Sequence, residues 1–271
     1  MLPPPQVAPR VAQQVELIPV LHDNYIVVLH DGQQAAVVDP AVAGPVIAWL
    51  EERSLELVAV LQTHHHSDHI GGTPGLLQHW PAAGVVASRD DQERIPFQTH
   101  SVGDGDHFTL LGRPVKVLAV PGHTRSHIAF HLPALPPEPA RSAPLGPIQA
   151  EPIQAELFCG DTLFAGGCGR LFEGTPQQMV DSLGRLSALD GATRVWCAHE
   201  YTEGNLRWAA AERPHDRAIA ERLATVQALR ERQQPTIPST IAQERATNLF
   251  VRAGNADALA RLRLSKNNWS G

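Results

Sequence analysis

The sequence is poor in cysteine and has no excess of positive charge. Only 3 of its 271 residues are cysteine, an odd, sparse number that excludes a disulfide framework and is typical of a reducing compartment. The 22 Lys and Arg residues are outnumbered by 28 Asp and Glu, which gives a formal net charge of -6. A protein that binds nucleic acid normally needs a basic face, so this balance argues against a nucleic-acid partner.

Long apolar segments are also missing from the sequence. The best apolar runs, at 58–61 and 115–120, have the length of strands, whereas a membrane-spanning helix needs about 20 residues. The first ten residues lack the apolar core of a secretory signal. We therefore expect a cytoplasmic protein without a membrane partner.

The composition is that of a globular protein with an unusual amount of histidine. Hydrophobic residues make up 43% and charged residues 18%, as in packed domains and not in disordered chains. At about 150 residues per domain, the length fits one large domain or two smaller ones. The chain has 14 histidines, and they are unevenly distributed.

Hydrophobic patterning predicts an α/β part over roughly the first 200 residues and a helical tail after it. Short apolar runs between turn residues predict strands at 15–21, 25–30, 35–39, 57–62, 85–88, 108–111, 115–120, 128–132, 157–159 and 194–198. Helical spacing predicts helices at 44–53, 75–80, 176–189, 217–232, 240–245 and 256–264. Thr175, with Gln178 three residues later, is a capping-box signature at the start of the third helix.

Residues 133–156 interrupt this pattern between two predicted strands. The segment is rich in Pro and Ala and contains the pentapeptide PIQAE twice in tandem, at 147–151 and 152–156. Prolines at this density disfavour both a helix and a central strand. We interpret the segment as an exposed, mobile loop insertion. A functional lid at the rim of a site is the less favoured alternative.

The densest chemistry lies directly after the predicted strand 57–62, in the sequence THHHSDH. Alternate residues of an extended segment share a face, so His64 and His66 point the same way and His65 points the other way. Asp68 and His69 follow on a turn, from which they can reach the same side. This H-x-H-x-D-H pattern predicts a site for zinc, manganese or iron, and its spacing disfavours a merely solvated histidine cluster.

Three further candidate ligands each follow a predicted strand. They are His123, Asp161 and His199. A lone histidine after a strand is more often a hydrogen-bonded structural residue, but sites in α/β folds gather at one end of the strands. Together with the motif they make seven ligands, which are too many for one four-coordinate ion and suit two metals that share a carboxylate and a hydroxide. Hydrolysis is the reaction that such a site suggests.

With these motifs the sequence resembles the metallo-β-lactamase superfamily, and within it glyoxalase II, the hydroxyacylglutathione hydrolases. The similar segments, apart from the metal motif, are 18–25, 121–124, 160–164, 167–170, 199–202, 238–240 and 246–252. The resemblance implies an αββα sandwich of two mixed β-sheets flanked by helices, with a helical C-terminal domain that binds substrate. We expect the catalytic domain at 1–199, including the insertion, and the helical domain at 200–271.

The resemblance also implies roles for the ligands. His64, His66 and His123 would hold one metal, Asp68, His69 and His199 would hold the second, and Asp161 would bridge them. Asp68 and Asp161 are in addition expected to be catalytic. The hydroxide between the metals would attack the thioester of S-D-lactoylglutathione and release D-lactate and glutathione. Two divalent ions per chain are expected, with zinc favoured over iron or manganese.

Glutathione carries two carboxylates, so cationic partners are expected in the pocket. The resemblance implies five substrate-binding positions: Arg170, Phe172, Tyr201, Arg263 and Lys266. Phe172 stands where many relatives carry tyrosine, so one hydrogen bond to substrate is expected to be missing. Without the resemblance, Arg263 and Lys266 would be interpreted as solvated helix charges.

Other functions remain as alternatives. Persulfide dioxygenases of the same superfamily use a single iron and can carry the same motif, whereas the helical tail and the segment 167–170 favour the hydrolase. A nuclease is disfavoured by the net charge, and a non-catalytic binding module would have lost ligands. The three cysteines are interpreted as small buried residues and not as nucleophiles. A monomer is expected.

Overall fold

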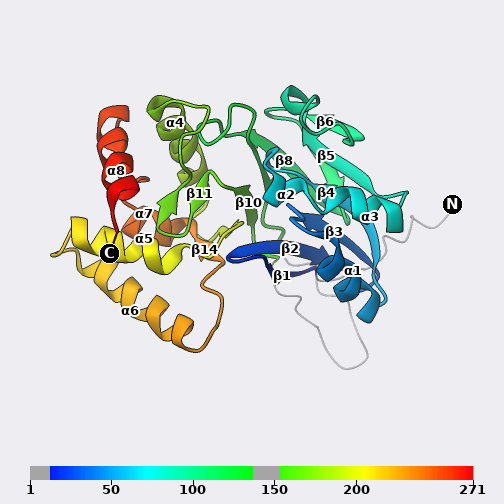
Figure 1. Ribbon diagram of the computed structural model, residues 1–271, viewed down its shortest axis with the longest axis horizontal. Coiled ribbons are helices and arrows are strands. Elements are labelled where there is room, and N and C mark those ends of the chain that lie inside the picture. The colour runs from blue at the N-terminus through cyan, green and yellow to red at the C-terminus, as the bar shows by residue number, and fades with distance from the viewer. Residues whose placement is uncertain (1–12, 137–152, 271) are drawn as a thin grey trace, which may run out of the picture.

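The computed structural model describes residues 13–136 and 153–270. Two six-stranded sheets lie face to face at the centre, and helices cover the outer face of each (Figure 1). The expectation of an αββα sandwich with helices at the C-terminus is confirmed. No helix in the described part of the chain is both long and apolar enough to span a membrane.

The first sheet is built from the N-terminal third of the chain. Its order is β1 (Gln14–Val20), β2 (Asn24–His30), β3 (Gln34–Val38), β4 (Glu56–Leu61), β5 (Gly84–Ser88) and β6 (His100–Val102). The first three strands are antiparallel and the pairs from β3 onward are parallel. Helix α1 (Ala43–Glu52) connects β3 to β4, and α3 (Thr73–His79) lies in the connection from β4 to β5, since parallel neighbours need a crossover.

The second sheet is mixed as well. Its order is β14 (Ser239–Thr240), β13 (Arg194–Cys197), β10 (Glu156–Gly160), β9 (Ile128–Leu132), β8 (Arg113–Ala119) and β7 (His107–Leu110). Only β10 and β13 run parallel, and the other neighbours are antiparallel. A small hairpin of β11 (Leu163–Phe164) and β12 (Gly167–Cys168) follows β10.

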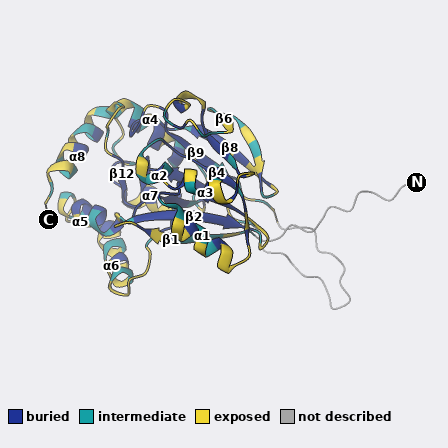
Figure 2. Cartoon of the chain, turned by 45° about the vertical axis from the view of Figure 1, so that its right-hand side comes forward, coloured by how far each residue is buried: buried dark blue, intermediate teal, exposed yellow. Residues whose placement is uncertain are grey.

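Three apolar layers hold the sandwich together, and alternate residues of one strand enter different layers. Val28 of β2 packs toward α1, whereas Val27 and Leu29 pack between the sheets against residues such as Phe130 and Phe158. Because helices or a second sheet cover both faces, the central strands are buried along their length (Figure 2). This is why they lack the alternation of a half-exposed strand.

The third layer lies between the second sheet and the remaining long helices. These are α4 (Pro176–Ser187), α5 (Thr202–Glu212), α6 (Arg217–Glu231), α7 (Ile241–Thr247) and α8 (Ala256–Asn268). Trp208 of α5 stacks on Phe250, with ring centroids 5.1 Å apart, and both are fully buried. The capping box of Thr175 and Gln178 at the start of α4 is present as predicted.

The predicted strands and helices agree with the structure to within a few residues, but some elements were missed. The largest is α5, whose buried face includes the polar residues Thr202 and Asn205, so that its apolar helical pattern is weak. The short strands β6, β11, β12 and β14 and the four-residue helix α2 (Ser67–Ile70) were missed too. The predicted domain boundary at 199/200 falls between β13 and α5, and the division itself stays a prediction.

The insertion at 133–156 connects β9 to β10, as expected. Its residues 137–152 lie outside the described part. Its two ends lie side by side through a bridge between Leu135 and Ile153, and the Arg113 guanidinium donates hydrogen bonds to the carbonyls of Pro133 and Gln154. Leu132 pairs with Glu156, so these ends lie at the end of the sheet opposite to Asp161, which follows the last residue of β10.

Replacing Phe158 by alanine tests the packing between the sheets. Phe158 is fully buried, and the cavity is expected to lower the free energy of unfolding by about 3–5 kcal/mol. Leu264→Ala, at a side chain that is 63% exposed, is the matched control and should change it by less than about 0.5 kcal/mol. Chemical denaturation of both variants measures the difference. Equal stabilities would contradict the assigned core.

Candidate metal centre and substrate pocket

The seven candidate ligands lie at one end of the sandwich, where strands of both sheets end. The first sheet contributes the four ligands of the H-x-H-x-D-H motif, which begins just after β4 ends at Leu61 and continues into α2, which begins at Ser67. The second sheet contributes the residues that follow β8, β10 and β13: His123, Asp161 and His199. The site is therefore shared between the sheets, as the strand-end positions predict.

Close backbone packing fixes the motif in place. Asp68 and His69 lie within α2, and the turn is closed by the backbone N–H of His69, which donates to the carbonyl of His66. A β-carbon on Gly72 would come within 2.5 Å of the backbone carbon of Val42, so only glycine fits there. The chain after α2 can thus pack directly against the start of α1.

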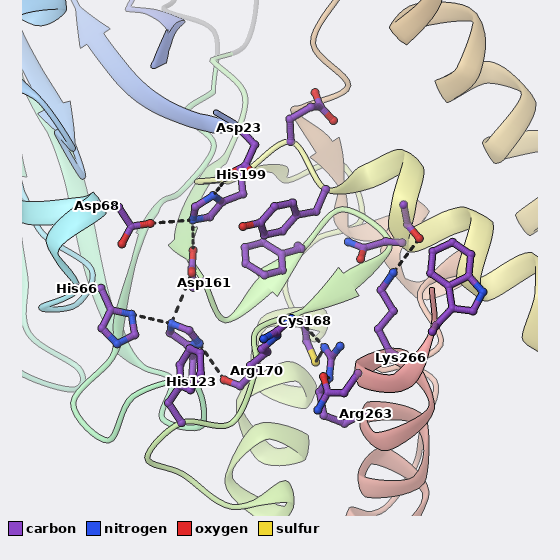
Figure 3. A pocket seen from close by; sticks show the side chains of 18 of the residues that line it. Asp23, His66, Asp68, His123, Asp161, Cys168, Arg170, His199, Arg263 and Lys266 are labelled. Atoms are coloured by element: carbon purple, nitrogen blue, oxygen red, sulfur yellow. Dashed lines mark hydrogen bonds and ion pairs between the residues drawn. The ribbon is translucent and has the colours of Figure 1, made fainter. Parts of the chain in front are cut away.

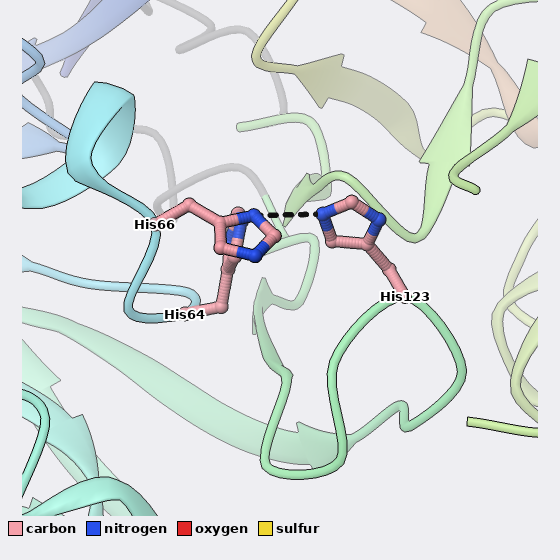
Figure 4. Close-up of side chains that lie close together, drawn as sticks. All are labelled: His64, His66 and His123. Atoms are coloured by element: carbon pink, nitrogen blue, oxygen red, sulfur yellow. Dashed lines mark hydrogen bonds between the residues drawn. The ribbon is translucent and has the colours of Figure 1, made fainter. Parts of the chain in front are cut away.

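Three imidazole nitrogens converge in the first group of ligands (Figure 4). His66 Nδ1 lies 3.0 Å from His64 Nε2 and 3.1 Å from His123 Nε2. An ion that binds such nitrogens at 2.0–2.1 Å in a tetrahedron holds them roughly 3.3 Å apart. Burial lowers the pKa of all three imidazoles, that of His66 to about 4, so they stay neutral, which is the form that binds metals.

The second group consists of Asp68, His69 and His199, whose ligand atoms lie within 4.8 Å of one another. Asp68 Oδ2 is 3.6 Å from His69 Nε2 and 3.5 Å from His199 Nε2. The Asn24 amide also donates a hydrogen bond to Asp68 Oδ2, at 3.2 Å. These three side chains therefore offer two nitrogens and an oxygen to one point.

Asp161 lies between the two groups. Its Oδ1 is 3.5 Å from His69 Nε2 and 3.4 Å from His199 Nε2, and its Oδ2 is 3.5 Å from His123 Nε2 on the other side. Burial raises the pKa of this carboxyl, but His69 and His199 outweigh it and lower the pKa well below its usual range. The carboxylate is thus ionised and points one oxygen at each group (Figure 3).

The donor set fits a pair of divalent ions. His69 Nε2 and Asp161 Oδ1 are buried and have no hydrogen-bond partner among the described residues. Buried polar atoms without a partner are costly, and a cation at this point would satisfy both. All the donor atoms of the seven side chains are nitrogens or carboxylate oxygens, the donors that zinc, iron and manganese share.

Hydrogen bonds from the opposite ring nitrogens orient these imidazoles. Nδ1 of His69 lies 3.0 Å from Asp39 Oδ2, and Nδ1 of His199 lies 2.8 Å from Asp23 Oδ1. His123 Nδ1 lies 2.8 Å from the Arg170 carbonyl. Since these oxygens only accept, each Nδ1 carries a proton, and Nε2 is the ring nitrogen that faces the metal centre.

Asp39 and Asp23 were not predicted to belong to the site. Asp39 accepts hydrogen bonds from both the backbone and the hydroxyl of Thr63, and His64 Nδ1 lies 3.0 Å from that hydroxyl. With His64 and His69 it also forms a third group of possible ligands, but its oxygens already have these partners. The available signal was its position directly after β3, at the same end of the sheet as the motif.

His65 points away from the metal centre, as the alternation predicts. Its ring nitrogens lie 3.3 Å from Asp91 and 3.7 Å from Glu173, and Arg94 lies beside all three. Glu173 also accepts a hydrogen bond from the backbone of Arg125. The middle histidine of the motif thus contacts the loop that follows Arg170, and it belongs to none of the ligand groups found among the described residues.

A cavity of about 910 Å³ leads from the ligands to α8. All five predicted substrate-binding residues line it: Arg170, Phe172, Tyr201, Arg263 and Lys266. Figure 3 shows the candidate ligands at one end and the α8 cations at the other. His64 and His69 are buried behind the lining residues.

The cations of α8 are held in place and are not freely solvated. The guanidinium of Arg263 donates to the Cys168 carbonyl at 2.9 Å and lies 4.9 Å from the Phe250 ring centre. Lys266 Nζ donates to the Gly204 carbonyl at 2.8 Å. Burial, together with Arg263, lowers the pKa of Lys266 to about 8. The alternative of ordinary helix charges is therefore disfavoured.

The aromatic residues form the sides of the cavity next to the ligands. The Tyr201 ring stacks on His199, with centroids 4.8 Å apart and planes at 5°. Burial and then nearby carboxylates raise its pKa, so the hydroxyl stays protonated and can donate. Phe172 is 63% exposed and lies edge-on to His123, which places an apolar ring at the rim.

The cysteines are buried, as interpreted from the sequence. Cys159, Cys168 and Cys197 are free, and their side chains are almost fully covered. Burial raises the pKa of Cys168 to about 11 and that of Cys197 to about 12. Because the thiolate is the nucleophile, these thiols are inert at neutral pH.

Comparisons with known proteins agree with this geometry. Residues 18–135 match the model of the metallo-beta-lactamase superfamily, and residues 200–269 match that of the hydroxyacylglutathione hydrolase C-terminus. A hydroxyacylglutathione hydrolase of Parasynechococcus marenigrum is 56% identical over 93% of this chain and 96% of its own.

Two solved structures are similar in fold. ETHE1 from Myxococcus xanthus is 23% identical with a TM-score of 0.66, covering 95% of this chain and 92% of its own, and it supports the fold alone. TTHA1623 in a di-iron-bound form is 25% identical with a TM-score of 0.51, covering 69% of this chain and 91% of its own. With a relative 56% identical over nearly its whole length, the chain belongs to the hydroxyacylglutathione hydrolase family of the metallo-beta-lactamase superfamily.

Proposed function

We propose that the protein hydrolyses S-D-lactoylglutathione to D-lactate and glutathione at a site that holds two divalent metal ions. The observation that carries the proposal is the position of Asp161, which directs one oxygen to each of two ligand groups. The relative from Parasynechococcus marenigrum carries the name of this activity. The chain is thus a hydrolase of that family acting on a thioester.

The two ions would occupy the two ligand groups. His64, His66 and His123 form one, and Asp68, His69 and His199 form the other. Asp161 would be shared, because its two oxygens face the two groups. Bound there, the ions would supply hydroxide at neutral pH and polarise the thioester carbonyl. Zinc is the first choice for this donor set and iron and manganese are the others, and the related TTHA1623 is described in a di-iron-bound form.

The cavity suggests how the chain orients its substrate. Arg263 and Lys266 lie at the end remote from the ligands, and Arg170 lies on the wall between them. Carboxylates of the glutathionyl part would pair with these cations, which places the thioester at the metal end. Tyr201 would donate a hydrogen bond to the same part. The leaving thiolate is stable, so no general acid is needed.

Two features of the proposal concern the organisation of the chain. The catalytic ligands come from the predicted domain 1–199, and the α8 cations come from the predicted domain 200–271. In this arrangement each domain supplies one half of the function, and neither would suffice alone. The monomeric state and the cytoplasmic location remain predictions.

A glutathione persulfide dioxygenase with a single iron is the alternative function. A site for a single iron needs only some of the donors that meet here. The second ligand group is complete, with His69, His199 and the Asp68 carboxylate beside Asp161, and this favours two metals. The two functions differ in the reaction and in the number of metals. One experiment can therefore separate them.

We expect the purified protein to hydrolyse S-D-lactoylglutathione and to contain about two metal ions per chain. Thioester absorbance and elemental analysis measure the two quantities on the same preparation. Glutathione persulfide with an oxygen electrode is the comparison assay. Oxygen consumption with one iron per chain would establish the alternative, and full hydrolysis by metal-free protein would exclude the mechanism.

Asp161→Asn tests the shared carboxylate. The amide has the same size but no charge, so we expect kcat to fall more than about 100-fold and metal to be lost from both groups. Glu173→Gln, at a carboxylate outside the ligand set, is the control and should keep both metals. Normal turnover by D161N with two bound metals would show that Asp161 does not bridge.

Lys266 should give the substrate affinity a pH dependence. Its pKa of about 8 means that the side chain is charged below this pH and becomes neutral as pH rises through it. KM should therefore increase between pH 7 and 9, while kcat changes little. In Lys266→Arg the charge persists, because guanidinium stays protonated, so the increase should disappear. A KM independent of pH in the wild type would exclude Lys266 from substrate binding.

A further inference from the structure

His127 is a buried histidine that neither ligand group uses. It is 0% exposed and lies one residue before β9, at the metal end of the second sheet. Its ring is stacked on that of His64, with centroids 4.6 Å apart and planes at 19°. It therefore lies behind the metal centre, on the side away from the cavity.

Both ring nitrogens of His127 have partners in the chain. The backbone N–H of Asp161 donates to His127 Nε2 at 3.2 Å, so this nitrogen must be unprotonated. The proton is then on Nδ1, which lies 3.1 Å from the carbonyl of Ile128. Neither nitrogen is free to bind a metal, and the ring has a single tautomer that suits both neighbours.

The contact with Asp161 depends on a glycine. Gly160 has a φ of +47°, and a β-carbon there would lie 3.0 Å from His127 Cε1 and 2.2 Å from the Thr63 hydroxyl oxygen. The chain can therefore pass close to both side chains only without a β-carbon. His127 thus lies against three residues. They are Gly160 at the end of β10, Asp161 directly after β10, and His64, which follows a strand of the first sheet.

We propose that His127 is a positioning residue that holds the backbone of Asp161 and the ring plane of His64, and so sets the spacing between the two ligand groups. The inference rests on the proposed function. The residue touches neither the substrate nor the ions in this role. It acts through the orientation of a ligand from each sheet.

The chemistry at this point favours histidine over other residues. A carboxylate could accept the Asp161 N–H, but it would place a second buried negative charge beside that of Asp161. A phenylalanine would keep the stacked ring and leave the buried N–H without a partner, at a cost in free energy. A neutral imidazole combines an uncharged acceptor with a flat face for His64.

Two amide variants distinguish the effect of the hydrogen bond from Asp161 N–H from the effect of side-chain volume at position 127. In His127→Gln the amide oxygen can reach the position of Nε2 and accept from Asp161, whereas in His127→Asn the side chain is too short. We expect H127N to bind metal 10–100-fold more weakly than the wild type, as for other residues that orient ligands. H127Q should stay within about threefold of the wild type, because it keeps the acceptor.

The measurements are competition of each holoenzyme with a fluorescent zinc chelator and steady-state kinetics with a glutathione thioester. H127N should lower kcat and leave KM unchanged, because Arg263 and Lys266, at the far end of the cavity, lie on α8. Leu50→Ala, a cavity variant of a fully buried side chain of α1 in the apolar layer on the outer side of the first sheet, controls for loss of stability. If circular dichroism shows that H127N is unfolded, His127→Phe replaces it, with the same expected loss.

The proposal is wrong if H127N or its replacement binds metal as tightly as the wild type. It is also wrong if H127Q or L50A loses as much metal affinity as H127N, because the effect would then be general. Failure of the proposed function has a different signature. In that case the wild type itself would hold no metal and hydrolyse no thioester.

Discussion

The centre of this structure depends on one buried charge, the carboxylate of Asp161. Transfer of a carboxylate from water into a protein interior costs several kcal/mol unless other groups compensate it. Nε2 atoms of His69, His123 and His199 lie within 3.5 Å of its oxygens. Those imidazoles are themselves oriented by Asp39, Asp23 and a backbone carbonyl. Metal binding and the fold of this region are therefore linked, since a cation in either group stabilises the ionised carboxylate.

The same constraint explains why the two sheets must be packed in one register. His64, His66, Asp68 and His69 follow a strand of the first sheet, and the other three ligands follow strands of the second. Each ligand group takes residues from both sheets, so the apolar layer between the sheets, in which Phe130 and Phe158 are fully buried, aligns the two parts of each group. Core residues far from the chemistry determine the geometry at the metal end.

Much of this arrangement could be predicted from the sequence, because the ligands follow a spacing rule and the strands that precede them are strongly apolar. The position of His65 away from the site followed from alternation alone. The residues that orient the ligands were not predicted, since Asp39, Asp23 and His127 lie outside the motif and act through contacts across the fold. Helix α5 was missed because two of its buried positions, Thr202 and Asn205, are polar and weaken the apolar pattern. The α8 cations required the resemblance, since their spacing alone is that of any charged helix.

The ends of the insertion after β9 have a practical consequence for protein engineering. Arg113 and the bridge between Leu135 and Ile153 hold the two ends of the insertion together, at the end of the second sheet opposite to Asp161. Ends fixed in this way tolerate connecting segments of different length, because the entropic cost of closing a loop increases only slowly with its length. The segment between them is therefore a suitable place to shorten the chain or to insert a reporter domain while the hydrolase centre stays intact.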